Sequence, residues 1–252
     1  VLKEDQNVDS VADELVKTKG LGVEHRYETA LKGFSAKIPA ARINEVKNDP
    51  RVQFVSEDRI VTISSHLSGS SVQTLPTGIN RVDADINPNE ATGVGVAVID
   101  TGIDLDHPDL KANISANKNC VRPSRAAKDD NGHGSHVAGT IAAINNTQGV
   151  IGVASQAKLI AVKVLNAAGS GTWSGVICGI DWVTANAASY NIKVANMSLG
   201  GGGSSDNNCG NSNSDALHKA ICKSRDAGVT YIVAAGNEGD NASNHVPAAY
   251  DD

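Results

Sequence analysis

Residues 93–100 read GVGVAVID and residues 158–165 read KLIAVKVL, and these two apolar runs decide the fold class. Neither shows the alternation of apolar and polar residues expected of a half-buried strand, so both are predicted to be strands covered on both faces. Similar runs follow in KVANMSL at 193–199 and VTYIVAAG at 229–236. Helical patterns separate the runs: HVAGTIAAI (136–144), WSGVICGIDWVTANAA (173–188) and DALHKAICKSRDAG (215–228). This alternation predicts an α/β fold with a mainly parallel, doubly wound sheet.

The chain ahead of this sheet predicts a separate, small α+β unit. Apolar residues from Val8 to Val16 recur at helical spacing, with Asp9 or Ser10 as the cap and Gly20 as the stop. The later segments predict, in order, a strand, a strand, a helix and a strand: GVEHRYETA (22–30), GFSAKIP (33–39), PAARINEVKND (39–49) and VQFVSEDRIVT (52–62).

A domain boundary is expected in the stretch SSHLSGSSVQT at 64–74, which is polar, small and almost free of charge. Such a composition is typical of an exposed linker. We therefore divide the chain into a small domain at 1–64, a linker at 65–72 and a larger domain at 73–252.

Composition excludes several classes of protein. The net charge of −6 comes from interspersed acids and bases, so there is no basic surface pattern that would favour a nucleic acid partner. No apolar run approaches the roughly 20 residues that a membrane-spanning helix needs. The first residues, VLKEDQNVDS, lack the layout of a signal peptide, so we expect any export signal to have been removed already.

The four cysteines do not form a C-x-x-C pair, which gives structural zinc poor support. We expect disulfides, with buried free thiols as the alternative. Four cysteines allow three complete pairings, and the sequence does not choose among them. The cysteines are Cys120, Cys178, Cys209 and Cys222.

Three polar residues stand where chemistry is expected in a parallel sheet, just beyond the ends of strands. Asp100 closes the first strand and begins the motif D-T-G, which by itself is also compatible with a turn aspartate or an aspartic protease. His133 lies between two glycines at the start of a helix, where an imidazole can exchange protons; a metal site with His136 is the weaker alternative. Asn237 follows the last strand and could cap a turn or donate a hydrogen bond to an oxyanion.

Together the segments VAVIDTGID, NGHGSHVAGT and AAGNEG resemble the aspartate, histidine and oxyanion motifs of the subtilase family, in that family's order. The resemblance implies a subtilisin-like fold and a serine endopeptidase. Asp100 would orient the imidazole, His133 would act as the general base, and Asn237 would help to hold the oxyanion. Substrates would be proteins or peptides, with broad preference.

The resemblance also implies where a substrate binds. The segment MSLGG and the opposing residues 169–171 look like the two strands between which an extended peptide adds its backbone. Trp173 would border the pocket for the fourth residue before the scissile bond, with core packing as the alternative. Glu238 would lie near the first pocket, with simple solvation as the alternative. The implied substrate-binding residues are Gly169, Ser170, Gly171, Trp173, Ser198, Leu199, Gly200 and Glu238.

A calcium site follows from the same resemblance, because INNTQGVIGVA at 144–154 looks like the family's calcium loop. Carbonyl, carboxamide and carboxylate oxygens are the donors that this hard cation prefers. A turn without metal is the alternative. The implied ligands are Gln73, Asp109, Ile144, Asn146, Gln148 and Val150.

Residues 1–64 resemble the subtilase propeptide, a ferredoxin-like folding chaperone and inhibitor, whose cleavage would fall between about Ser64 and Val72. The family's nucleophile lies in a G-T-S-M-A segment, which residues 1–252 do not contain. We therefore expect a chain nicked or truncated after Asp252, with the serine on a C-terminal fragment. A secreted, extracellular zymogen is expected; the alternatives are an inactive, propeptide-bound binding module and a nucleotide-binding α/β protein.

Overall fold

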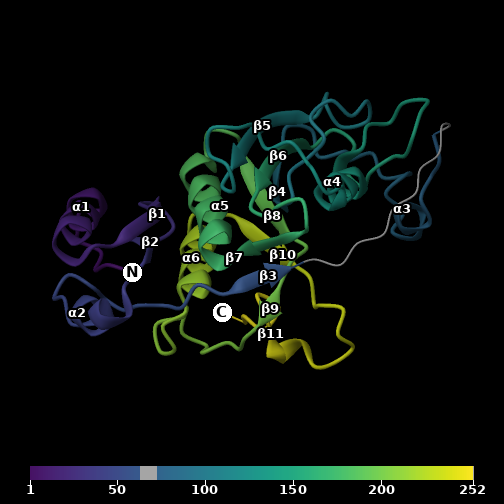
Figure 1. Ribbon diagram of the computed structural model, residues 1–252. Coiled ribbons are helices and arrows are strands. Elements are labelled where there is room, and N and C mark those ends of the chain that lie inside the picture. Colours follow the sequence, from purple (N-terminus) through teal and green to yellow (C-terminus); the bar gives the residue numbers. More distant parts are fainter. Residues whose placement is uncertain (63–72, 252) are drawn as a thin grey trace.

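The computed structural model describes residues 1–62 and 73–251, which form a small N-terminal domain and a larger α/β domain (Figure 1). The predicted linker at 65–72, with the predicted cleavage region, lies outside the described residues. In the view of Figure 1 the small domain sits beside α5, on the opposite side of the molecule from α3.

The small domain pairs two strands, β1 (Gly22–Tyr27) and β2 (Gly33–Lys37), antiparallel to each other. The first helix, α1 (Val8–Lys19), is capped by the side chain of Asn7 rather than by Asp9 or Ser10, and Gly20 ends it in the left-handed conformation as predicted. The predicted second helix divides into η1 (Ala40–Arg42) and α2 (Ile43–Lys47). The core of the small domain consists of Leu2, Val8, Val11, Leu15, Leu21, Val46 and Val52.

The segment 52–62, predicted as one strand, is different in the structure. Val52 makes an isolated bridge with Leu2, and only β3 (Ile60–Thr62) is a strand. β3 pairs antiparallel with β7 (Ser170–Thr172) of the large domain. The residues between Val52 and Ile60 therefore cross from the small domain to the large one. The sequence pattern of 52–62 is the same for an extended crossing segment as for a strand in the small domain, so the sequence does not distinguish them.

The large domain is built on five parallel strands in the order β10-β8-β4-β6-β5, which confirms the predicted parallel sheet. Its edge strand β5 was not predicted, because its residues ISANKN are mostly polar and alternate in burial. The strands are β4 (Gly95–Asp100), β5 (Ile114–Asn119), β6 (Lys158–Lys163), β8 (Ile192–Met197) and β10 (Thr230–Val233).

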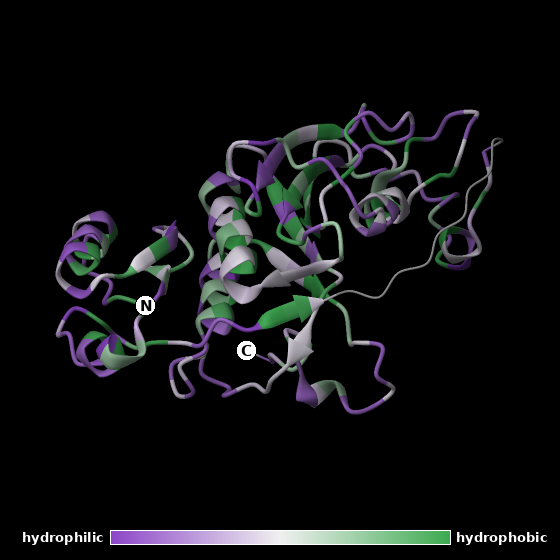
Figure 2. Ribbon diagram, viewed as in Figure 1, coloured by the Kyte–Doolittle hydropathy of each residue, from purple (hydrophilic) through white to green (hydrophobic). Residues whose placement is uncertain are grey.

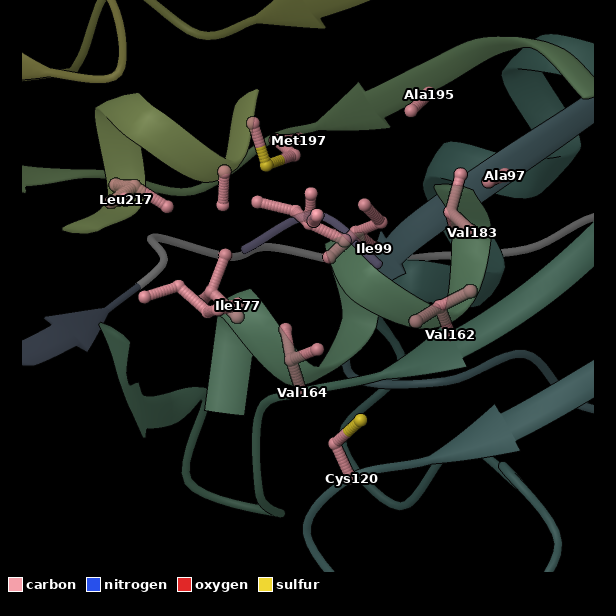
Figure 3. Close-up of a cluster of buried hydrophobic side chains, with 14 of the residues drawn as sticks. Ala97, Ile99, Cys120, Val162, Val164, Ile177, Val183, Ala195, Met197 and Leu217 are labelled. Atoms are coloured by element: carbon pink, nitrogen blue, oxygen red, sulfur yellow. The ribbon is translucent and has the colours of Figure 1, made fainter. Parts of the chain in front are cut away.

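Helices cover both faces of this sheet, as the doubly wound prediction requires. Ala97 and Ile99 of β4 share a buried cluster with α5 (Trp173–Asn186) and α6 (Ala216–Asp226), as Figure 3 shows for α5. Val96 and Val98 instead pack with α4 (His133–Ala142) on the other face. All six residues of β4 are buried, and the apolar stretches in Figure 2 gather in the central strands and the helices around them.

Shorter elements complete the large domain. α3 (Thr77–Arg81) lies beyond α4, and β9 (Gly201–Gly202) pairs antiparallel with β11 (His245–Val246). The 3₁₀ helix η2 (Ala242–Asn244) precedes β11.

Two disulfides select one of the three possible cysteine pairings. Cys120, which follows β5, is bonded to Cys178 of α5, and Cys209 is bonded to Cys222 of α6. Each bond therefore ties a loop to one of the two helices on the same face of the sheet. In the oxidising surroundings where such bonds persist, they restrict the unfolded chain.

The small domain is attached to α5 by apolar and polar contacts. Tyr27 and Ala30 belong to the same buried cluster as the core of α5, and the Tyr27 hydroxyl donates to the carbonyl of Ser174 at 3.1 Å. The carboxylate of Asp181, on α5, accepts the backbone N–H groups of Thr29 and Ala30 at 2.6 Å each. These contacts hold the turn between β1 and β2 against α5.

Replacement of Ile99 tests the central position of β4. Ile99 is 0% exposed, so Ile99→Ala should lower the free energy of unfolding by about 2–5 kcal/mol, since a cavity remains. The control is Ile86→Ala, at a side chain 75% exposed, which should change it by about 0.5 kcal/mol or less. Urea unfolding of the complete protein measures both, and equal losses would contradict this packing.

Candidate active site

Asp100 is the last residue of β4, and its side chain is completely buried. One carboxylate oxygen, Oδ1, accepts the backbone N–H of Thr101 at 2.6 Å. The chain turns sharply next, at Gly102, where φ is 101°. A side chain at Gly102 would meet the carbonyl oxygen of Ala127, so the turn needs glycine for space as well as for conformation.

His133 begins α4, and its ring faces this carboxylate. The Nδ1 atom lies 2.9 Å from both Oδ1 and Oδ2 of Asp100, and the His133 side chain is 16% exposed. The contact assigns the ring proton to Nδ1 and leaves Nε2 as the basic nitrogen.

Gly134 lets α4 approach Asp100 this closely. A Cβ atom at Gly134 would collide with the carbonyl oxygen of Gly102 and crowd Thr101. The backbone N–H of Gly134 donates to the Thr101 hydroxyl at 2.9 Å, and this hydroxyl donates to Asp129 at 2.9 Å. The first turn of α4 is therefore fixed against the end of β4.

Asp129 organises the loop that carries His133, and the sequence analysis did not find it. Oδ1 accepts the backbone N–H groups of Asn131 and Gly132 at 2.9 Å each. Oδ2 accepts the N–H and the hydroxyl of Ser135 at 3.0 and 2.6 Å. Burial acts to raise the pKa of Asp129, but these hydrogen bonds outweigh it and the pKa is lowered. The signal available in the sequence was an acid four residues before a glycine-flanked histidine.

Lys163, at the end of β6, is a second group that the sequence analysis missed. It is 3% exposed, and its ammonium donates to the carbonyl oxygens of Thr101 and Leu165 at 2.6 and 2.8 Å. A third bond, of 2.6 Å, goes to the carboxylate of Asp130. Lys163 thus holds the turn after Asp100 from the neighbouring strand.

The pKa of His133 is raised above its ordinary value. The main cause is the hydrogen bond to Asp100, and the negative charges of Asp100 and Asp129 add to it, while burial opposes it. A carboxylate that stabilises the imidazolium makes His133 a stronger proton acceptor.

Asn237 follows β10, and its side chain is exposed. Because β10, β8 and β4 are parallel neighbours, Asn237 lies at the same carboxyl edge of the sheet as Asp100, with β8 between them. The backbone N–H of Asn237 donates to Glu238 Oε2 at 2.7 Å. Its role toward an oxyanion stays a prediction.

β3 lies between the two segments predicted to bind substrate (Figure 1). On one side Val61 is opposite Gly171 of β7, and Thr62 is opposite Ser170. On the other side Thr62 bridges Gly200 antiparallel. An extended segment of this chain thus pairs with the backbone of both.

The other predicted substrate residues surround this strand in different ways. Trp173 is buried, and its backbone N–H donates to the carbonyl of Arg59 at 3.1 Å, just before β3. Leu199 is buried, while the Ser198 hydroxyl accepts from Asn196 at 2.9 Å. Gly169, with φ of 72°, closes the turn before β7.

The predicted calcium ligands gather around one buried carboxylate. Asp109 is 2% exposed; its Oδ1 accepts from the Asn146 amide at 3.0 Å and its Oδ2 from the Val150 N–H at 3.1 Å. The Gln73 side-chain nitrogen Nε2 donates to the carbonyl oxygens of Ile144 and Val150, at 3.2 and 3.4 Å. Segments far apart in sequence therefore bring oxygen atoms to one place.

The loop itself is shaped to enclose Asp109. The backbone N–H of Gln148 donates to Asn146 Oδ1 at 2.6 Å, which tightens the loop. At Gly149, where φ is 60°, a Cβ atom would overlap the Asp109 carboxylate. The Asp109 carboxylate and the carbonyl oxygens of Ile144 and Val150 are donors that fit Ca²⁺, and the amide nitrogens of Gln73 and Asn146 donate to them.

Comparison with known proteins gives the family. The subtilase family profile matches residues 91–252. The chain belongs to the subtilase family. The profile of peptidase inhibitor I9 matches residues 2–64, so this subtilase carries an N-terminal propeptide domain.

Named relatives cover most of this subtilase chain. Subtilisin E of Bacillus subtilis (strain 168) is 38% identical over 245 residues, 94% of this chain and 58% of that protein. Alkaline serine exoprotease A of Vibrio alginolyticus is 36% identical over 235 residues, 90% of this chain and 41% of that protein. The crystal structure of a cold-adapted subtilisin-like serine proteinase is 37% identical in sequence, with a TM-score of 0.53. The match covers 64% of this chain and 52% of the proteinase chain. The chain thus spans between 41% and 58% of the length of these relatives.

Within residues 1–62 and 73–251, none of the helices has the length and apolar character needed to cross a membrane.

Removal of the Asp100 charge tests the electrostatics of the subtilase site. In Asp100→Asn the pKa of His133 should fall, because the carboxylate that stabilises the imidazolium is lost. An NMR titration of the His133 ring measures this shift, with Asp104→Asn as the control carboxylate nearby in sequence. An unchanged pKa in Asp100→Asn would contradict the assigned pair.

Proposed function

We propose that this chain is the propeptide and the front part of the catalytic domain of a secreted serine endopeptidase zymogen. The observation that carries the proposal is the contact between buried Asp100 and His133, in a domain where β3 already pairs as an added strand between residues 169–171 and Gly200. Residues 1–64 would be the propeptide, 65–72 the maturation linker and 73–252 the catalytic part.

His133 would be the general base of the reaction. Its Nε2 takes the proton of a serine hydroxyl as the serine oxygen bonds to the peptide carbonyl carbon. The carbonyl becomes an oxyanion, toward which the Asn237 carboxamide donates. The imidazolium, held by ionised Asp100, then protonates the leaving amine, and water releases the acyl group by the same steps in reverse.

The serine would come from a segment outside residues 1–252, since the family's G-T-S-M-A motif is not among them. A C-terminal fragment that stays assembled with this chain would supply it in a nicked protein. Intact mass under denaturing conditions distinguishes a companion fragment from a single species.

Protein substrates would bind as β3 does. The residues 169–171 and 198–200 offer backbone on both sides of an extended peptide, which suits many sequences because main-chain hydrogen bonds carry the affinity. The propeptide would inhibit by leaving β3 in this groove. Asp58 supports the position of β3, because its carboxylate accepts the N–H and hydroxyl of Ser174 at 2.9 and 2.7 Å.

Secretion is supported by the two disulfides, which persist in oxidising compartments. Calcium would be bound by Gln73, Asp109, Ile144, Asn146, Gln148 and Val150. When bound, it would neutralise the buried Asp109 charge and hold the loop 144–150 against the segment that follows the linker.

Replacement of the general base tests the activity. His133→Ala in the complete protein should lower the rate of peptide hydrolysis by at least about 10⁴-fold, since proton transfer from the serine is lost. The propeptide should also stay uncleaved, as intact mass would show. His136→Ala, which removes an exposed histidine one turn along α4, is the matched control and should retain hydrolysis. Unchanged hydrolysis in His133→Ala would refute the proposal.

Chelation tests the calcium site independently of activity. Removal of calcium should lower the melting temperature; at calcium one hundred times its Kd, the ligand contributes about 2.7 kcal/mol of stability. Asp109→Asn should melt at the same temperature with and without chelator. The control is Asp106→Asn, at an 81% exposed carboxylate, which should respond to chelator as the native protein does. A native melting curve that chelator leaves unchanged would remove the calcium assignment.

A further inference from the structure

Three side chains with metal-binding groups meet beside the turn that carries Asn237. Glu238, Asp240 and His245 each offer one ligand atom, and these atoms lie within 4.8 Å of one another. His245 Nε2 is 2.6 Å from Asp240 Oδ1, and His245 Nδ1 is 4.0 Å from Glu238 Oε2. Neither Asp240 nor His245 has a part in the proposed mechanism.

The backbone brings these groups together from two elements. Gly236 and Gly239, with φ of 104° and 73°, fold the chain after β10 so that both carboxylates turn back toward β11. His245 is held in β11, which pairs with β9, and its side chain is 16% exposed. The carboxylates of Glu238 and Asp240 are 58% and 51% exposed, so they can reorient around a fixed imidazole.

The donor set determines the kind of ion. One imidazole with two carboxylates suits Zn²⁺ and similar transition metals, whereas Ca²⁺ prefers oxygen donors alone. Zinc bonds of about 2.0–2.2 Å place the ligand atoms of a tetrahedral ion roughly 3.3–3.6 Å apart. One ring nitrogen of His245 would be the ligand, and the exposed carboxylates, whose ligand atoms lie within 4.8 Å of it and of each other, would turn toward the same ion.

We propose that Glu238, Asp240 and His245 form a binding site for a transition-metal ion of the Zn²⁺ class. The site is distinct from the calcium loop, which surrounds Asp109. Water would complete the coordination from the exposed side.

A metal ion bound at this site would alter the hydrogen bonding of Asn237, in the catalytic region, through Glu238. Glu238 Oε2 now accepts the backbone N–H of Asn237 at 2.7 Å, and a metal ion would compete for that oxygen. The fixed ligand His245 lies in a strand paired to Gly201 and Gly202, directly after the predicted substrate segment. This effect rests on the proposed protease function, under which metal binding lowers the rate of peptide hydrolysis. The binding of the metal does not depend on that function.

A binding titration tests the site without activity. The complete protein carrying His133→Ala, which removes the catalytic imidazole as a competing ligand, is titrated with Co²⁺ and then Zn²⁺ in excess Ca²⁺. We expect one cobalt ion with visible ligand-field absorption, displaced by zinc. Adding His245→Ala or Asp240→Asn should weaken binding at least tenfold, while His136→Ala should not. Equal binding in all variants, or no cobalt binding, would overturn the proposal.

Inhibition is then measured with His133 intact. Zinc should slow hydrolysis by the native protein, and inhibition by the same zinc concentration should be largely lost in His245→Ala. Equal inhibition in both would overturn the coupling to Asn237. A protein that binds cobalt as expected but hydrolyses no peptide would refute the proposed function and leave the metal site in place.

Discussion

The contact between the buried carboxylate of Asp100 and Nδ1 of His133 is the interaction on which the rest of the large domain depends. A carboxylate without exposed surface is costly unless donors surround it, and here the N–H of Thr101 and the imidazole supply them. The imidazole can reach Asp100 only if α4 begins directly against the end of β4. That requirement explains why Gly134, with no side chain, occupies the closest approach.

The surrounding polar groups keep this contact in one geometry. Asp129 gathers the N–H groups of the loop ahead of α4, and Lys163 holds the turn after β4 from the next strand. Both are buried or partly buried and satisfied by several hydrogen bonds, which is the condition under which such groups make a site rigid. A strong base at His133 follows, because its pKa is raised by a carboxylate that cannot move away.

The propeptide domain is positioned by α5 as much as by the groove. Asp181 binds its loop at one end, Asp58 binds the start of α5 at the other, and β3 extends from Asp58 into pairing with β7. An added strand and contacts to a helix are separate anchors, so release of the domain requires that both be lost. The same carboxyl edge of the sheet also carries the turn with Asn237, close to the cluster around His245.

The sequence by itself predicted the parallel sheet, four of its five strands with the helices between them, and the pairing of Asp100 with His133, because hydrophobic periodicity and short glycine-flanked motifs are local properties. Tertiary structure decided which cysteines pair, that β3 joins β7 rather than the sheet of its own domain, and that Asp129 and Lys163 support the site. The polar edge strand β5 was also found only in the structure. Its sequence lacks an apolar strand pattern, and its backbone pairing with β6 holds it in the sheet. The physical reason is the same in each case. Every one of these features is a contact between residues distant along the chain, and tertiary packing, which local sequence patterns do not specify, selects which residues meet.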